Sequence, residues 1–201
     1  VACSAESFSF IYQEHLDILR RLGTVTFFNP EHNRPLPKGT DLLYLPGGYP
    51  EKCHTRLSRA WRRMQSVRNY AEAGGRVLAE CGGMIYLSKG ILFDRPEHQG
   101  IATGPQTGVF PFYISSRKAD RRLTLGYRSF DYNGQHLRGH EFHYSALAAE
   151  PGGKPLFAAK DLRGNVRPAG SARGNVCGSY IHLYFGSNPT AAAAFAEGMR
   201  R

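Results

Sequence analysis

The sequence predicts an α/β fold in which a mostly parallel β-sheet is flanked by helices and continued by an antiparallel β extension. Apolar runs of strand length alternate with amphipathic helical patterns through the first half of the chain, an order typical of a parallel sheet covered by helices. Residues 42–45 form an uninterrupted apolar run, as in a strand buried on both faces. From about residue 107, strand-like pieces are separated by Gly and Asn-Gly signals, which favour antiparallel hairpins.

Two amphipathic helices are predicted in the first half of the chain. The first ends at Gly23 and the second at Gly74-Gly75, because glycine is the usual residue after a helix C-terminus. Strands are expected at residues 1–3, 25–28, 42–45 and 76–80, and a further helix follows residue 81. The apolar stripes are Tyr12, Leu16, Leu19 and Leu22 in the first helix, and Leu57, Trp61, Met64, Val67 and Ala71 in the second, with arginines opposite.

The second half of the chain is predicted to be mostly strands. They are expected at residues 108–113, 123–130, 136–144, 156–159 and 176–183, with an Asn133-Gly134 turn and a glycine-rich loop before the last strand. A closing helix is predicted over residues 190–199, capped by Asn188 and begun by Pro189.

Composition narrows the class of protein. The chain has 201 residues and a formal net charge of +10, but its basic clusters lie in no nucleic-acid module, so we expect solvated faces and no nucleic-acid or membrane partner. No secretory signal opens the chain, and the scattered cysteines Cys3, Cys53, Cys81 and Cys177 form no metal-binding spacing. We therefore expect a single cytoplasmic domain over residues 1–201 that holds no metal or cofactor of its own.

Residues 76–84 contain the most informative pattern. A short apolar strand ends at Cys81, Gly82-Gly83 follows at once, and the chain resumes an apolar run at Met84. Such a strand, sharp turn and helix lift a nucleophile above the edge of a parallel sheet, where small neighbours let the backbone turn tightly. Cys81 is therefore the predicted nucleophile.

A cysteine nucleophile needs a base to form its thiolate. Ligands collect beyond the carboxyl ends of parallel strands, so His182, directly after the apolar run that includes Cys177 to Ile181, is the best-placed histidine. His143 is the competitor and is expected to come from the antiparallel part. The oxyanion formed on attack also needs N–H donors, which Gly82 and the Gly47-Gly48 turn could supply.

Four motifs in this order resemble the class I glutamine amidotransferase domain of cobyrinic acid a,c-diamide synthase, which has a flavodoxin-like fold. They are L-P-G-G-Y-P-E at residues 45–51, A-E-C-G-G at 79–83, G-H-E-F-H-Y-S at 139–145 and S-Y-I-H-L-Y-F at 179–185. Residues 5–12 and 187–189 resemble the family as well, so the resemblance covers nearly the whole chain.

The resemblance implies a glutaminase. Cys81 would attack the side-chain amide of glutamine to form a glutamyl thioester, with His182 as general base and acid. Gly48 and Gly82 would form the oxyanion hole, and His143, Tyr144 and Ser145 would line the glutamine pocket. The ammonia would pass to an ATP- and Mg-dependent synthetase domain that amidates a corrin precursor. No G-x-x-x-x-G-K-[ST] motif is present, so we expect that domain upstream or on another polypeptide, and this chain to be the C-terminal part of a longer synthetase.

One departure from the resemblance leaves alternatives open. Most class I glutaminases carry His-x-Glu, whereas Tyr184 stands two residues after His182 here. The group that orients the histidine could be Glu141, a backbone carbonyl or a residue of the missing domain. The alternative functions are a related glutaminase with another acceptor (as in cobyric acid synthase, or a nickel tetrapyrrole or cell-wall lipid precursor) and a non-catalytic interaction domain of the same fold.

Overall fold

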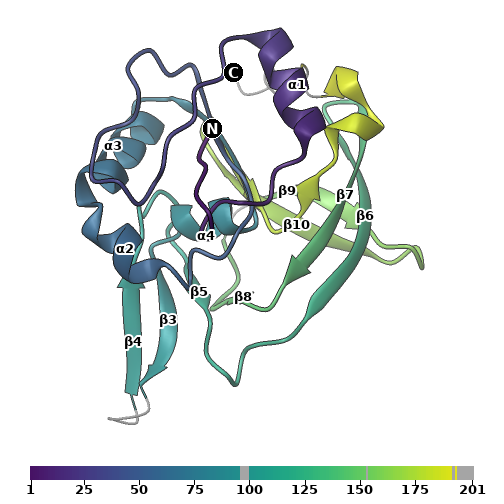
Figure 1. The fold of residues 1–201 in the computed structure, drawn as a ribbon. Coiled ribbons are helices and arrows are strands. Elements are labelled where there is room, and N and C mark those ends of the chain that lie inside the picture. Colours follow the sequence, from purple (N-terminus) through teal and green to yellow (C-terminus); the bar gives the residue numbers. More distant parts are fainter. Residues whose placement is uncertain (96–99, 153, 192, 194–201) are drawn as a thin grey trace.

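The computed structural model describes residues 1–95, 100–152, 154–191 and 193 (Figure 1). Its main sheet has eight strands in the order β1-β2-β11-β10-β9-β6-β7-β12. The first three strands pair in parallel and the others antiparallel. Their bounds are β1 Leu42–Leu45, β2 Arg76–Glu80, β11 Val176–Ser179, β10 Val166–Arg173, β9 Pro155–Lys160, β6 Thr124–Tyr132, β7 Gln135–His143 and β12 His182–Leu183.

A smaller sheet lies beside the main one and is mostly antiparallel. Its order is β4-β3-β5-β8, with β4 Gly100–Pro105, β3 Gly90–Arg95, β5 Tyr113–Ser115 and β8 Ala146–Leu147. The helices are α1 Gln13–Leu22, α2 His54–Arg59, α3 Trp61–Glu72 and α4 Gly82–Leu87, and a 3-10 turn, η1, spans Phe185–Ser187. No helix among the described residues is both long and apolar enough to cross a bilayer.

Alternate side chains of the three parallel strands enter two separate cores. Leu43, Leu45 and Val77 pack with residues of α2, α3 and α4, whereas Tyr44 and Leu78 face the other way, where α1 contributes Ile18 and Leu19. This alternation follows from the two-residue period of a strand. Helices therefore cover both faces, which confirms the predicted fold class, including the antiparallel extension.

The structure corrects several predicted elements. The second helix is broken at Ala60, which changes the phase of the helical pattern, so Trp61 is 58% exposed and Arg63 is buried against Phe28. The glycine-rich loop before the last strand is instead β10. The strands predicted at residues 1–3 and 25–28 share only an isolated bridge between Ala2 and Phe28. Pro189 does begin a helix, but most of residues 190–199 lies outside the described residues.

The last predicted strand, residues 176–183, is two strands. β11 ends at Ser179, whose Oγ accepts a hydrogen bond from Ile181 N–H at 3.0 Å. The chain then leaves β2 and re-enters the sheet as β12, which pairs antiparallel with β7. His182 is therefore placed by the antiparallel part of the sheet, and not by the end of a parallel strand as the sequence suggested.

We predict that Gly83→Ala destabilises the fold by about 3 kcal/mol, because a Cβ at this position would overlap the carbonyl oxygen of Leu45 and lie 2.7 Å from its carbon. Backbone atoms of a buried strand cannot move away cheaply. Gly23→Ala is the matched control: its Cβ would meet nothing within 4 Å and its φ of 171° suits any residue. Chemical denaturation should place the control within about 0.5 kcal/mol of the parent chain. Equal losses in both variants would contradict the packing argument.

Candidate active site

Cys81 lies in a strained turn between β2 and α4. Its φ is 44° and its ψ −103°, and the only other non-glycine residue with positive φ in the described part of the chain is Asn133 in a hairpin turn. Cys81 N–H donates to the Ser179 carbonyl at 2.7 Å, and the Cys81 carbonyl accepts from Ile85 N–H at 3.0 Å. Such strain persists only where neighbouring structure enforces it, and it is typical of functional sites.

The turn that follows β1 packs directly on the turn that follows β2. A Cβ on Gly82 would lie 2.8 Å from Gly48 N and 2.7 Å from Gly48 O, so only glycine permits this approach. The structure therefore brings together the two predicted oxyanion donors. Within the described residues, Gly48 N–H donates to no acceptor. The assignment of Gly48 and Gly82 to an oxyanion hole remains a prediction.

The imidazole ring of His182 packs against the backbone of Gly47. A Cβ on Gly47 would overlap His182 Cε1 and lie 2.8 Å from Nδ1, so the imidazole rests on the bare backbone of the turn. The Gly47-Gly48 turn thus contacts His182 on one side and the Cys81 elbow on the other. Residues from three distant parts of the sequence meet at this one point.

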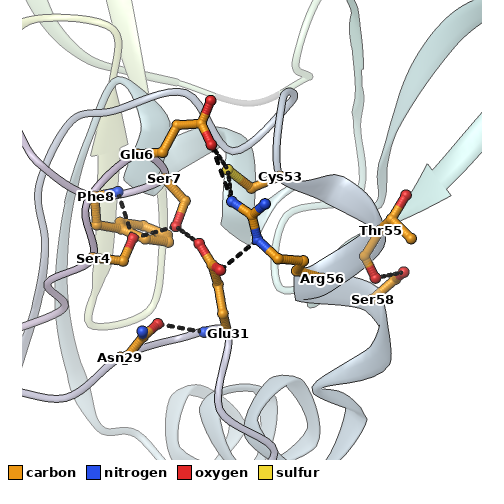
Figure 2. A network of polar contacts seen from close by, with 10 residues as sticks. All are labelled: Ser4, Glu6, Ser7, Phe8, Asn29, Glu31, Cys53, Thr55, Arg56 and Ser58. Carbon is orange, nitrogen blue, oxygen red and sulfur yellow. Dashed lines mark hydrogen bonds and ion pairs between the residues drawn. The ribbon is translucent and has the colours of Figure 1, made fainter.

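A polar network fixes the N-terminal loop that supports this turn. Arg56 donates to Glu31 at 2.6 Å and to Glu6 at 3.0 Å, and Ser7 Oγ donates to Glu31 at 2.8 Å (Figure 2). The same loop accepts Tyr49 N–H at the Glu6 carbonyl, 3.1 Å away, and a Cβ on Gly48 would overlap the Ser7 carbonyl. The network therefore holds the loop against the back of the glycine turn.

His182 is a buried, uncharged imidazole. Its ring stacks on His140 with centroids 4.8 Å apart and planes 13° apart, and His140 is held in turn by the Tyr12 hydroxyl at 3.2 Å. Burial, followed by the nearby histidines His140, His143 and His15, lowers the pKa of His182 to about 3. Its Nε2 has no hydrogen-bond partner within the described residues. A neutral ring of this kind can accept a proton.

Glu141 does not orient His182. Its Oε2 accepts from Arg128 at 2.8 Å and also from Arg167, and the side chain is buried in this pairing. The sequence left three candidates for the group that orients His182. Glu141 was one of them, and its carboxylate is bound to two arginines instead.

The three predicted glutamine-pocket residues lie at the end of β7 and just beyond it. His143 stacks on Tyr180 with ring centroids 3.8 Å apart, and its Nδ1 donates to the Ser145 carbonyl at 2.8 Å. Ser145 Oγ is 3.1 Å from the Tyr180 hydroxyl, whereas Tyr144 is 48% exposed. The neighbouring Phe142 carbonyl is 3.9 Å from Cys81 Sγ, so this segment borders the nucleophile. His143 is stacked on Tyr180 and bonded to Ser145, so it is better suited to line the predicted glutamine pocket than to act as the base.

Burial raises the pKa of the Cys81 thiol above its ordinary range. The negative charge of Glu51 adds to the shift, and a hydrogen bond from Gly82 N–H opposes it. The side chain is 3% exposed. In this chain Cys81 is therefore a protonated thiol at neutral pH, and a thiolate requires proton transfer on substrate binding.

Sequence analysis missed Glu51 as a site residue. Its Oε2 is buried without a hydrogen-bond partner among the described residues, and burial raises its pKa while the charges of Lys52 and Arg121 oppose the shift. It is close enough to Cys81 to act on the thiol electrostatically. Glu51 is the last residue of the motif at residues 45–51, but only the fold shows that one of its carboxylate oxygens is buried without a partner in the described part of the chain.

Comparisons with known proteins show the family to which the chain belongs. The profile of the CobB/CobQ-like glutamine amidotransferase domain matches residues 1–190. A cobyrinate a,c-diamide synthase of Syntrophotalea carbinolica is 38% identical over 206 residues, covering 96% of this chain and 43% of that protein. A hydrogenobyrinate a,c-diamide synthase of Pseudomonas aeruginosa is 40% identical over 195 residues, covering 94% and 41%. The chain thus spans about two fifths of the length of these relatives.

A solved structure shares the fold. The crystal structure of a glutamine amidotransferase superposes with a TM-score of 0.63, covers 98% of this chain and 97% of its own, and is 20% identical in sequence.

We predict that iodoacetamide at neutral pH alkylates the exposed Cys3 at least about tenfold faster than Cys81, because the buried thiol forms little thiolate. Peptide mass mapping over time would measure both rates, and the denatured chain is the control in which all four cysteines should react alike. Preferential labelling of Cys81 in the folded chain would show that its thiol is activated without substrate.

Proposed function

The chain belongs to the CobB/CobQ-like glutamine amidotransferase family, and on this premise we propose that it is the glutaminase domain of a cobyrinate or hydrogenobyrinate a,c-diamide synthase. The observation that carries the proposal is the contact of one glycine turn with both the Cys81 elbow and the ring of His182. In this proposal Cys81 is the nucleophile, His182 is the base, and the N–H groups of Gly48 and Gly82 are the oxyanion donors. Together they are the set that acyl transfer from an amide requires.

The reaction follows from these groups. His182 takes the proton of Cys81 as sulfur attacks the side-chain carbonyl carbon of glutamine, and the resulting oxyanion accepts hydrogen bonds from Gly48 and Gly82 N–H. His182 then gives the proton to the departing nitrogen, so ammonia leaves and a glutamyl thioester forms. Water, deprotonated by His182, attacks the thioester and releases glutamate and the free thiol. No metal or redox group takes part in these steps.

We assign the reaction of the ammonia with its acceptor substrate to another part of the enzyme. This chain does not fit ATP phosphates, because the glycine turns after β1 and β2 lack the Lys-Ser/Thr pair of a P-loop. We assign ATP and Mg²⁺ to a synthetase domain, in keeping with relatives more than twice as long as this chain. That domain would activate the carboxylates of the corrin precursor that receive the ammonia.

Glu51 supports glutamine as the substrate. A buried carboxylate oxygen such as Oε2 of Glu51, which has no hydrogen-bond partner among the described residues, is costly unless a ligand supplies a donor, and the α-ammonium group of glutamine would do so. Its position near Cys81 suits an amino acid whose side-chain amide points at the thiol. We therefore assign Glu51 to recognition of the α-ammonium group.

We predict that Cys81→Ala and Cys81→Ser each lower glutamate release by at least about a thousandfold in an enzyme that contains this domain and its synthetase domain, because both remove the nucleophile. Glutamate would be measured with glutamine as nitrogen donor. The control is amidation with added ammonia, which bypasses Cys81 and should persist. Undiminished glutamate release in both variants would reject Cys81 as the nucleophile.

For Glu51→Gln we predict a KM for glutamine raised about 30-fold or more, with a smaller change in kcat, because a buried charge pair is lost. The matched substrate is glutaric acid monoamide, which lacks the α-amino group; with it, variant and parent should behave alike. Glu72→Gln, on the exposed face of α3, is the control variant. A similar loss with both substrates would exclude recognition of the α-ammonium group by Glu51.

A further inference from the structure

Three successive backbone N–H groups follow His182, and each has a different acceptor. Leu183 N–H donates to Glu80 Oε1 at 3.1 Å, and Tyr184 N–H to the Arg138 carbonyl at 2.8 Å. Phe185 N–H donates to His15 Nε2 at 3.1 Å. β12, the strand that contains His182, is only two residues long. These three hydrogen bonds therefore contribute much of the interaction that fixes its position.

Two of the acceptors are joined through a third side chain. His15 Nδ1 lies 3.2 Å from Tyr44 Oη, and the Tyr44 hydroxyl donates to Glu80 Oε2 at 2.8 Å. His15, Tyr44 and Glu80 are each at most 2% exposed and come from α1, β1 and β2. With the amides of Leu183 and Phe185 they form a closed circuit, which we call the Glu80 ring.

The hydrogen-bond directions in the Glu80 ring are mutually consistent. Since Phe185 N–H donates to His15 Nε2, the neutral imidazole carries its proton on Nδ1 and donates it to Tyr44 Oη. Tyr44 then donates to Oε2 of Glu80, whose Oε1 accepts from Leu183 N–H. Burial lowers the pKa of His15 to about 4, in keeping with a neutral ring. Burial raises the pKa of Glu80 to about 8, while the bonds from Tyr44 and Leu183 favour its carboxylate.

The Glu80 ring connects the nucleophile to the base. Glu80 is the residue before Cys81, and Leu183 is the residue after His182, so one hydrogen bond joins the neighbours of the two groups. Among the described residues the imidazole has no acidic partner to orient it: Glu141 is paired with Arg128 and Arg167, and Tyr184 occupies the position where a glutamate would follow His-x. Besides the pairing of β12 with β7 and the bond from Tyr184 N–H to Arg138, the Glu80 ring is what ties this segment to the strand that carries Cys81, so a distortion of the ring would move His182 relative to Cys81.

We propose that Glu80, Tyr44 and His15 are positioning residues of the glutaminase, which set the place of His182 relative to Cys81 by holding the backbone after the histidine. None of the three donates to the imidazole of His182 in the described structure. They fix His182 by holding its neighbouring main chain, whereas an acidic partner would orient a histidine by binding its imidazole directly. This inference rests on the proposed function, because it assumes that Cys81 and His182 act together on glutamine.

The test uses an enzyme that contains this domain and its synthetase domain, and the variant Tyr44→Phe. This change removes one buried hydroxyl and opens the Glu80 ring at two bonds. The expected result is a kcat for glutamate release lowered about ten- to a hundredfold with KM for glutamine nearly unchanged, since a small displacement of a catalytic group slows chemistry more than binding. Ammonia-dependent amidation should not change.

Tyr86→Phe is the matched control. Tyr86 is also fully buried, but its hydroxyl has no partner within the described residues, so its removal breaks no bond. It should leave kcat unaltered. Equal kcat values for Tyr44→Phe and Tyr86→Phe would overturn the proposal.

Two further measurements separate positioning from general loss of structure. The double variant Tyr44→Phe with Glu80→Gln should lose no more activity than the more impaired single variant, because both open the same ring. His15→Gln, which keeps an acceptor for Phe185 N–H, should retain more activity than His15→Phe at equal thermal stability. Additive losses, or losses that follow thermal stability alone, would contradict the inference. If Cys81→Ala itself kept full glutamate release, the proposed function would fail instead.

Discussion

The whole site depends on the close approach of bare backbone at consecutive glycines. The turn after β1 is in contact with the turn after β2, and the ring of His182 lies where the Cβ of any other residue at position 47 would be. A single methyl group at Gly47, Gly48 or Gly82 would push apart the two turns and the ring of His182. The glycines here are thus a steric requirement of this packing, in addition to a means of turning the chain, and the proposed chemistry depends on it.

Much of the rest of the structure supports that contact. The parallel strands β1, β2 and β11 deliver the two turns to the same edge of the sheet, and the Cys81 amide is bonded across to Ser179. The loop of residues 4–10 closes the back of the glycine turn and is tied down by Arg56 through Glu6 and Glu31. Exposed ion pairs of this type add little stability individually, but they select one loop conformation.

The charge state of the site is that of an enzyme before substrate binds. Burial keeps the Cys81 thiol protonated and the His182 imidazole neutral, so the proton is on sulfur and one ring nitrogen keeps an unprotonated lone pair that can accept it. The buried carboxylate of Glu51 makes a thiolate less favourable until a cation neutralises it. In our proposal the α-ammonium group of glutamine supplies that cation, so substrate binding and activation of the nucleophile are coupled electrostatically.

The sequence by itself determined the α/β class, the turn at Cys81 and the glycine turn after residue 45, because these depend on local patterns: apolar runs, glycine pairs and motifs of a few residues. The choice of His182 as the base rests on such a motif as well and stays a prediction. Only the tertiary structure decided which strand places His182 beside the glycine turn. β11 ends at Ser179, and an antiparallel strand carries the histidine to the site. It also decided that Glu141 binds arginines, that Oε2 of Glu51 is buried without a partner among the described residues, and that His15, Tyr44 and Glu80 form a ring. Hydrogen bonds between residues 29 to 170 positions apart leave no periodic trace in a sequence, so only the folded chain reveals them.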